Sequence, residues 1–96
     1  MALAHSYQMI AREGSEAALA SALEALAAAA KEIAGSQGTM LLQDRKEPRK
    51  FLFLEFWDSD ESRKAAGPQL PKDVMARIMA ALGGPLQMAD YDRLAG

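Results

Sequence analysis

The segment FLFLEFWDS, residues 51–59, places one acid two residues before the only tryptophan of the chain. In an extended strand, Glu55 and Trp57 leave the backbone on the same face as Phe53. A carboxylate on an apolar strand face has a raised pKa unless it is paired, so Glu55 is a candidate base for a phenolic proton. The alternative, which the residue types favour, is a structural acid that accepts hydrogen bonds. We expect Glu55 to be at least half buried, with an amide, a tyrosine hydroxyl or an arginine as donor.

Other polar residues indicate chemistry less strongly. His5 is the only histidine; it could act as a base, but a lone histidine is more often a surface or edge-strand residue, and we expect that here. Asp90 and Asp92 alternate on one face of the last strand, and two exposed acids without a histidine make a poor metal site. The chain has no cysteine, which excludes disulfides and zinc-thiolate sites. We therefore expect neither a metal nor a cofactor.

Composition sets the broad class of the protein. The 96 residues suffice for one domain, 1–96, and half of them are hydrophobic while a quarter are charged. A net charge of −2 gives no global attraction to nucleic acid or to an anionic membrane, so neither is expected as a partner. The amino terminus lacks the pattern of a signal peptide, and the Ala-rich stretch is too weakly hydrophobic to cross a bilayer. We expect a cytoplasmic protein.

Periodicity predicts the elements that position these residues. Alternation predicts strands, and apolar stripes with spacings of three and four predict helices. One stripe consists of Leu19, Leu23, Leu26, Ala30 and Ile33, and a second consists of Val74, Met75, Ile78, Met79 and Leu82. The expected strands cover residues 4–13, 38–45, 51–57 and 86–94, and the expected helices cover residues 15–34, 58–67 and 72–84. This order, β-α-β-β-α-β with a split second helix, predicts an α+β, ferredoxin-like antiparallel sheet with helices on one face.

The third expected strand is apolar on both faces. Helices can cover the face of Phe53 and Trp57, whereas Leu52, Leu54 and Phe56 point the other way. Exposing several such side chains would create an adhesive patch, because burying each one is worth roughly 1.5–3 kcal/mol. The chain has no spare segment to cover them, so we infer a homodimer with face-to-face sheets. A monomer whose apolar face binds another partner is the alternative.

The run Glu55-Phe56-Trp57-Asp58-Ser59 follows a proline-containing hairpin and precedes a broken helix and the closing residues ADYDRL. In this order and spacing the chain resembles the antibiotic biosynthesis monooxygenase (ABM) domain family, from the first strand to Leu94. The resemblance implies a dimeric α+β barrel. It also implies a cofactor-independent monooxygenase that binds a small aromatic or polycyclic phenol or quinol between sheet and helices.

On this resemblance Trp57 lines the pocket and, with Glu55, forms the catalytic pair. The implied substrate-binding residues are Phe53, Tyr7, Met75, Met79 and Tyr91. Methionines at helical spacing are, however, more often simple core. Haem-degrading members of the family use an axial histidine after the tryptophan and an asparagine on the first strand, whereas this chain has no histidine in the former place and Gln8 in the latter. The missing histidines also favour the alternative, a non-catalytic small-molecule-binding or dimerisation module.

Overall fold

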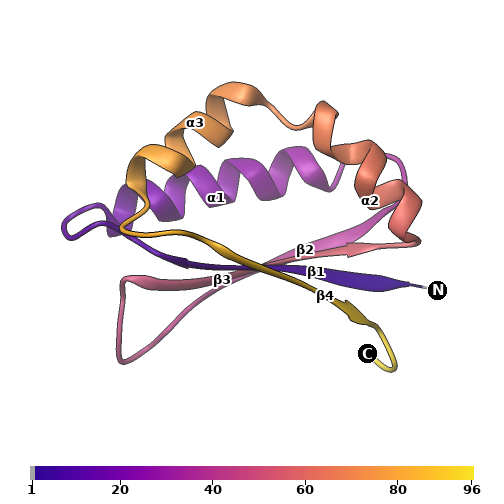
Figure 1. Cartoon of the computed structure of the whole chain (residues 1–96), viewed down its shortest axis with the longest axis horizontal. Coiled ribbons are helices and arrows are strands. Elements are labelled where there is room, and N and C mark those ends of the chain that lie inside the picture. Colours follow the sequence, from indigo (N-terminus) through magenta and orange to yellow (C-terminus); the bar gives the residue numbers. More distant parts are fainter. Residues whose placement is uncertain (1) are drawn as a thin grey trace.

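The computed structural model describes residues 2–96, and Figure 1 shows its helices lying together on one face of an antiparallel sheet. The strands are β1 (Leu3–Ile10), β2 (Ser36–Gln43), β3 (Lys50–Trp57) and β4 (Gln87–Asp92). The helices are α1 (Glu16–Ala30), α2 (Asp60–Ala66), the short 3₁₀ helix η1 (Gly67–Gln69) and α3 (Lys72–Ala81). The predicted α+β class and ferredoxin-like order of elements are confirmed.

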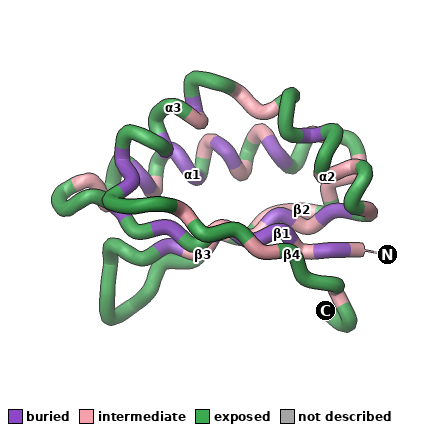
Figure 2. Tube along the Cα trace, in the orientation of Figure 1, coloured by how far each residue is buried: buried purple, intermediate pink, exposed green. Residues whose placement is uncertain are grey.

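The strands lie in the order β2-β3-β1-β4, and every neighbouring pair is antiparallel. The two central strands are therefore β1, which begins near the amino terminus, and β3, which carries FLFLEFW. The strand β4 lies at an edge, and Figure 2 shows it exposed along most of its length. The first and last strands of the chain are thus hydrogen-bonded neighbours.

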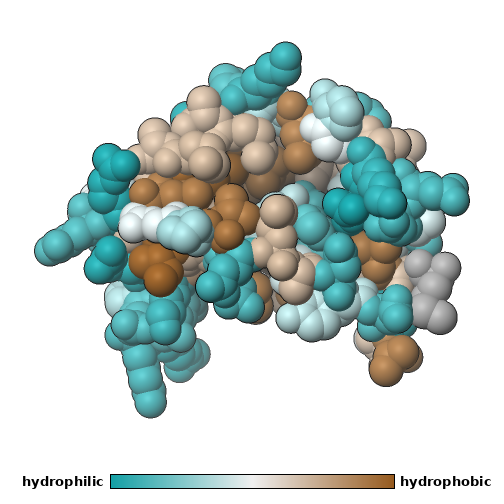
Figure 3. Space-filling model, viewed as in Figure 1, coloured by the Kyte–Doolittle hydropathy of each residue, from teal (hydrophilic) through white to brown (hydrophobic). Residues whose placement is uncertain are grey.

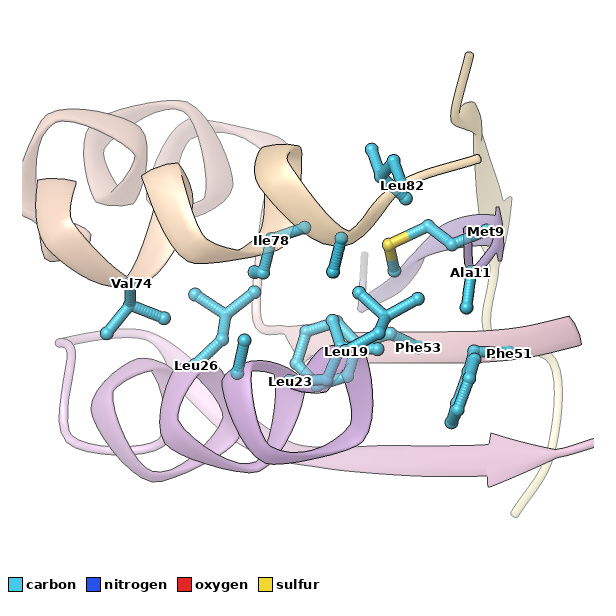
Figure 4. Packing of buried hydrophobic residues seen from close by; sticks show 12 residues of the cluster. Met9, Ala11, Leu19, Leu23, Leu26, Phe51, Phe53, Val74, Ile78 and Leu82 are labelled. Carbon is cyan, nitrogen blue, oxygen red and sulfur yellow. The ribbon is translucent and has the colours of Figure 1, made fainter. Parts of the chain in front are cut away.

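The apolar core lies between the sheet and the helices α1 and α3. Leu19, Leu23 and Leu26 of α1 are buried against Phe53 of β3 and Ile78 of α3 (Figure 4). The helical stripe of α1 is therefore in the predicted phase, and the opposite, exposed face consists of alanines with Ser21 and Glu24. Each large side chain buried in this way contributes roughly 1.5–3 kcal/mol.

The end of α1 differs from the expected position near residue 34. The helix ends at Ala30, and the amides of Glu32 and Ile33 bond to carbonyls three residues earlier, in the tighter pattern of a closing turn. Gly35 then adopts φ +90°, a conformation that other residues rarely take. The expected cap Ser15 flanks the helix but makes no side-chain cap hydrogen bond.

Gly35 also fixes the start of α2. A Cβ atom at this position would collide with the side chain of Ser62, so only glycine fits. The carbonyl of Gly35 accepts from the amide of Asp58 at 2.9 Å, and Ser59 caps α2 by accepting from the amide of Ser62 at 3.1 Å. These contacts hold α2 above the sheet next to Trp57. Figure 3 shows hydrophilic side chains over α2 and at the β2–β3 turn.

The face of the sheet away from the helices keeps an apolar surface. Leu52, Leu54 and Phe56 are only half-buried there, as the strand pattern predicted. Exposed apolar side chains extend this outer face on the neighbouring strands: Ile10, Met40, Leu42 and Tyr91. Arg93 stacks on the ring of Phe56, with its guanidinium carbon 4.8 Å from the ring centroid.

Candidate functional site

The helix-facing side of β3 changes character along its length. Phe53, near the middle, is completely buried in the apolar core, while Glu55 and Trp57 toward the end are 2% and 1% exposed. Their common face follows from strand alternation, and α2 provides the cover, since Trp57 packs with Ala66 of that helix and with Leu3 of β1. A carboxylate is thus enclosed beneath α2.

The register of the sheet places Glu55 in a row of polar side chains. Thr39 of β2 pairs with Glu55, Glu55 pairs with His5 of β1, and His5 pairs with Asp90 of β4. Directly opposite residues in antiparallel strands have Cβ atoms about 4.5–5.5 Å apart, so neighbours in this row can interact. The adjacent row on one side is mainly apolar and consists of Leu41, Phe53, Tyr7 and Met88.

His5 and Asp90 form the shortest contact in the row. The imidazole Nδ1 lies 2.6 Å from Oδ1 of Asp90, with the histidine side chain 6% exposed and the aspartate side chain 51% exposed. A carboxylate oxygen that accepts from Nδ1 selects the Nδ1–H tautomer, which leaves Nε2 as the ring nitrogen with the free electron pair. The imidazole also meets the ring of Tyr7 edge-on, with centroids 4.7 Å apart. These contacts fix the tautomer and orientation of His5.

Glu55 is incompletely satisfied. Its Oε1 accepts a hydrogen bond from the indole Nε1 of Trp57 at 3.3 Å, whereas its buried Oε2 has no partner among the described residues. Burial raises the pKa of Glu55 above its ordinary value. The Trp57 hydrogen bond, the neighbouring His5 and Arg63, and the Tyr7 hydroxyl act in the opposite direction without cancelling that effect. The expected burial is confirmed. The donor to Oε1 is an indole, and the hydroxyl of Tyr7, one of the expected kinds of donor, also acts on the carboxyl group.

Tyr7 and Arg63 complete the surroundings of the carboxylate. Burial, and secondarily the charge of Glu55, raises the pKa of Tyr7, so this side chain remains a phenol. Arg63 of α2 lies with its Nε 3.3 Å from Asp60 and 3.6 Å from Asp90. It is the cation that bears on both Glu55 and Tyr7. The group can hold a proton, donate hydrogen bonds and support a buried negative charge.

The structure brings together only part of the predicted site. Tyr7 and Phe53 lie on the same sheet face as Glu55 and Trp57, with the Tyr7 and Phe53 ring centroids 6.0 Å apart. Met75 is partly buried against the apolar core, on the α3 side of that cluster.

The expectation that Met79 and Tyr91 face the same interior is wrong. Met79 is 58% exposed, because the buried arc of α3 is formed by Val74, Ile78 and Ala81, and Met79 lies beyond its margin. Tyr91 is 55% exposed on the outer face, since Asp90 takes the inward position on β4.

The sequence interpretation underestimated His5 and Asp90. His5 was expected on the surface or an edge strand, but β1 is central and the residue is 5% exposed. Asp90 was expected to be one of two exposed acids without a histidine, whereas it bonds to that histidine. A usable signal was present, because His5 alternates with Tyr7 and Met9 on one strand face, and that face is apolar.

The described cavities do not open onto this group. One of about 550 Å³ lies near the β2–β3 turn and is lined by residues such as Gln8, Leu42 and Gln87. Others of about 560 Å³ and 320 Å³ lie beside the carboxyl terminus and between α1 and α3. Within residues 2–96, neither Glu55 nor Trp57 lines any of these three cavities.

Two further absences apply to residues 2–96. No cluster of three His, Cys, Asp or Glu side chains is arranged to hold a metal ion. No helix in this range combines the length and the hydrophobicity needed to cross a membrane.

Comparison with known proteins identifies what the chain is similar to. The family model described as antibiotic biosynthesis monooxygenase matches residues 4–66. PA3566 from Pseudomonas aeruginosa is 25% identical, with a TM-score of 0.82 over 98% of this chain and 95% of its own. No curated protein matches the sequence.

Two more distant structures share the fold. Rv0793 from Mycobacterium tuberculosis is 15% identical, with a TM-score of 0.84 over 100% of this chain and 98% of its own. A variant of SnoaB, a cofactor-independent oxygenase from Streptomyces nogalater, is 13% identical, with a TM-score of 0.84 over 99% of this chain and 95% of its own. At such identities the likeness concerns the fold alone.

Proposed function

Because the chain belongs to the antibiotic biosynthesis monooxygenase family, we propose that it is a cofactor-independent monooxygenase of a small aromatic or polycyclic phenol or quinol. The observation that carries this proposal is the buried carboxylate of Glu55, which has one free oxygen and lies beside Trp57 and Tyr7. A protein interior seldom keeps an incompletely paired acid without a use for it. The oxygenase activity of the structural neighbour SnoaB is consistent with this reaction class.

In the proposed mechanism the Glu55 carboxylate removes the phenolic proton, which leaves an electron-rich anion. That anion reduces dioxygen directly; one oxygen atom enters the ring, and the other leaves as water with two hydrogens of the substrate. Trp57 forms a wall of the site, and its indole N–H, which now bonds Glu55 at 3.3 Å, steadies the carboxylate during the transfer. The catalytic residues we propose are therefore Glu55 and Trp57.

Substrate contacts come from the neighbouring inner face. Phe53 and Tyr7 present aromatic rings beside Glu55, and Met75 borders the same layer from α3. An aromatic ligand is suited to such a lining, because rings pack well in offset or edge-on geometry and methionine adapts its shape. Since the described cavities do not reach Glu55, a ligand can enter only if α2 or an adjacent segment of the same chain moves aside.

The activity test is oxygen consumption with a panel of anthrones and hydroquinones. We expect wild-type turnover to exceed the uncatalysed rate and the rate of Glu55→Gln by about a hundredfold or more, the lower end for a proton-transfer residue, and to exceed that of Trp57→Phe by a smaller factor. Lys64→Ala, an exposed change on α2, serves as the control and retains activity. Equal rates for the wild type and both site variants would rule out the enzyme.

A second candidate, a non-catalytic binding or dimerisation module, is favoured by one observation: the described cavities avoid Trp57 and Glu55. Trp57 is the only tryptophan, so its fluorescence reports directly on ligand entry. Saturable quenching by a phenol without oxygen uptake would support this module. Quenching accompanied by oxygen uptake would support the enzyme.

The proposed assembly is a homodimer that covers the outer face of the sheet. Leu54 and Phe56 are half-buried at the centre of that face, and an introduced charge there would be desolvated in a sheet-to-sheet contact. We expect a wild-type dimer by light scattering, and aggregation or unfolding of Leu54→Asp. Met79→Asp adds the same charge at an exposed apolar residue on the helical side and leaves the dimer intact. A soluble, folded Leu54→Asp monomer would contradict an obligate contact through this face.

A further inference from the structure

We propose that His5 and Asp90 form a proton relay that connects the enclosed carboxylate of Glu55 with solvent at the β4 edge of the sheet. This inference rests on the proposed function, because a base that accepts a proton from each substrate must also release it. It assigns roles to two residues outside the proposed catalytic pair, and His5 is the link between them.

The first support is the gradient of exposure along the row. Glu55 is 2% exposed and His5 is 5% exposed, whereas the side chain of Asp90 is 51% exposed. The three residues are successive partners across β3, β1 and β4. A proton that moves along this row therefore travels from the interior to water within the width of three strands, about 10 Å at a strand spacing near 4.8 Å.

The second support is the enclosure of Glu55. Its Oε1 is bonded to Trp57, its Oε2 has no partner among residues 2–96, and none of the described cavities reaches it. A proton placed on this carboxyl group has no direct exit to solvent. His5, directly opposite on β1, is the nearest residue of the row that can accept it.

The third support is the fixed tautomer of His5. With Nδ1 donating to Asp90 at 2.6 Å, Nε2 holds the free electron pair and is the atom that receives a proton from the Glu55 side. Because Glu55 and His5 are direct partners across β3 and β1, a rotation of either side chain brings the carboxyl group to Nε2. The imidazolium then releases its Nδ1 proton through Asp90 to water. One proton enters the row, one leaves, and no electron moves.

The fourth support concerns the surrounding charges. The ionisable groups next to His5 are Tyr7 on its own strand, Glu55 on β3 and Asp90 on β4, and Arg63 of α2 approaches Asp90. The buried residues of α1 are all apolar. Arg63 of α2 lies 3.6 Å from Oδ1 of Asp90, so it holds the aspartate at the outer end of the row. Asp90 is thus a positioning residue with a solvent-facing acceptor.

The experiment is a pH jump followed by stopped-flow fluorescence of Trp57, without substrate. Because the Trp57 N–H bonds Glu55, protonation of this carboxylate changes the emission of the single tryptophan. We expect the response of His5→Ala and of Asp90→Asn to be at least tenfold slower than that of the wild type. Added imidazole should accelerate His5→Ala, and Asp90→Glu should retain most of the wild-type rate.

The matched control is Asp92→Asn. Asp92 is also an exposed acid of β4 on the same face, but it pairs with Leu3 rather than His5, so its variant keeps the wild-type rate. Since Asp90 is half-exposed, Asp90→Asn tests the relay even if His5→Ala does not fold. Wild-type rates in Asp90→Asn would overturn the relay, as would a slow His5→Ala that imidazole does not accelerate. Because no substrate is present, these outcomes are independent of whether the oxygenase reaction occurs.

Discussion

Under α1 and α3 the inner face of the sheet is filled with apolar side chains such as Met9 and Phe53, whereas under α2 it carries Glu55, His5 and Trp57. Both halves are covered to a similar degree, since Phe53 and Glu55 differ by only 2% in exposure. They differ in hydrogen bonding: among residues 2–96, the buried side-chain polar atom without a partner is Oε2 of Glu55, in the polar half.

The two halves contribute differently: the apolar half stabilises the fold, and the polar half provides ionisable groups. The apolar half gains free energy from every side chain that it removes from water, while burying ionisable groups costs free energy that their mutual contacts only partly return. A small protein gains little stability from the second arrangement. The cost in stability therefore falls at the end of the sheet where Glu55 can hold a proton.

The largest expected effect belongs to the apolar half. Leu23→Ala should lower the free energy of unfolding by about 2–5 kcal/mol, because the side chain is completely buried and its removal leaves a cavity. Glu24→Ala, one residue further on the exposed side of α1, should change it by less than about 0.5 kcal/mol. Urea denaturation of both variants measures the contrast. Equal losses would show that α1 packs with another face.

A smaller loss is expected from Trp57→Phe in the polar half. The ring remains apolar, but Oε1 of Glu55 loses its donor, and an unpaired buried acceptor costs about 1–3 kcal/mol. The lost hydrogen bond normally lowers the pKa of Glu55, so this pKa should rise further in the variant. Urea unfolding at pH 5 and pH 8 should show a greater loss at pH 8. A greater loss at pH 5 would contradict the role of the indole.

Glu55→Gln should increase stability, with a dependence on pH that identifies the cause. A carboxyl group with a raised folded-state pKa stabilises the fold fully below its unfolded value of 4.5, and this contribution is lost as pH rises through the folded-state pKa. The variant should therefore match the wild type near pH 4 and exceed it at pH 8, by on the order of 1 kcal/mol. Thermal melting across this range decides the matter. A variant less stable than the wild type at pH 8 would mean that the ionised group is well paired.

The smallest expected effect distinguishes two neighbouring cations of α2. Lys64 and Arg63 both pair with Asp60, but only Arg63 also approaches Asp90 and lowers the pKa of Glu55. Lys64→Ala should lower the unfolding midpoint only slightly, through the loss of an exposed ion pair with Asp60, and by the same amount at pH 5 and pH 8. Arg63→Ala should match it at low pH and be slightly less stable at pH 8, where Glu55 ionises without this cation. Identical pH profiles of stability for the two variants would show that Arg63 does not affect the ionisation of Glu55.

Local periodicity predicted the fold because it requires only neighbours in sequence. The alternation in FLFLEFW, the stripe through Leu19 and Leu23, and the glycine and proline breaks identify the strands, the helices and their order. The inward position of Glu55 beside Trp57 follows from the same rule. Boundaries were less accurate, as the early end of α1 shows, because closing turns compete with the last helical hydrogen bonds.

The partners of Glu55 could not be predicted in the same way. The contact between His5 and Asp90 depends on β1 pairing with β4, and a strand has no local mark of its neighbour or its register. Hydrophobicity alone also predicts the wrong orientation for β4. It favours an inward Tyr91, whereas Asp90 takes the inward position and bonds to the buried His5. On α3, Met79 extends the apolar stripe by one residue past the arc that is buried. Each error is an error of orientation or pairing rather than of element.

Because β4 lies at an edge of the sheet, the row that runs through Glu55, His5 and Asp90 can open locally while the rest of the protein stays folded. β4 pairs with β1 alone and buries little apolar surface, so native-state hydrogen exchange should detect its amides opening at a lower free energy than those of β3. Each opening carries Asp90 away from a histidine 85 residues distant in sequence, while the core beneath α1 and α3 stays closed. Fraying of β4 thus breaks the contact between His5 and Asp90, and re-pairing of the strand restores it. The fraction of molecules with an intact row is set by this local equilibrium within a protein that remains folded.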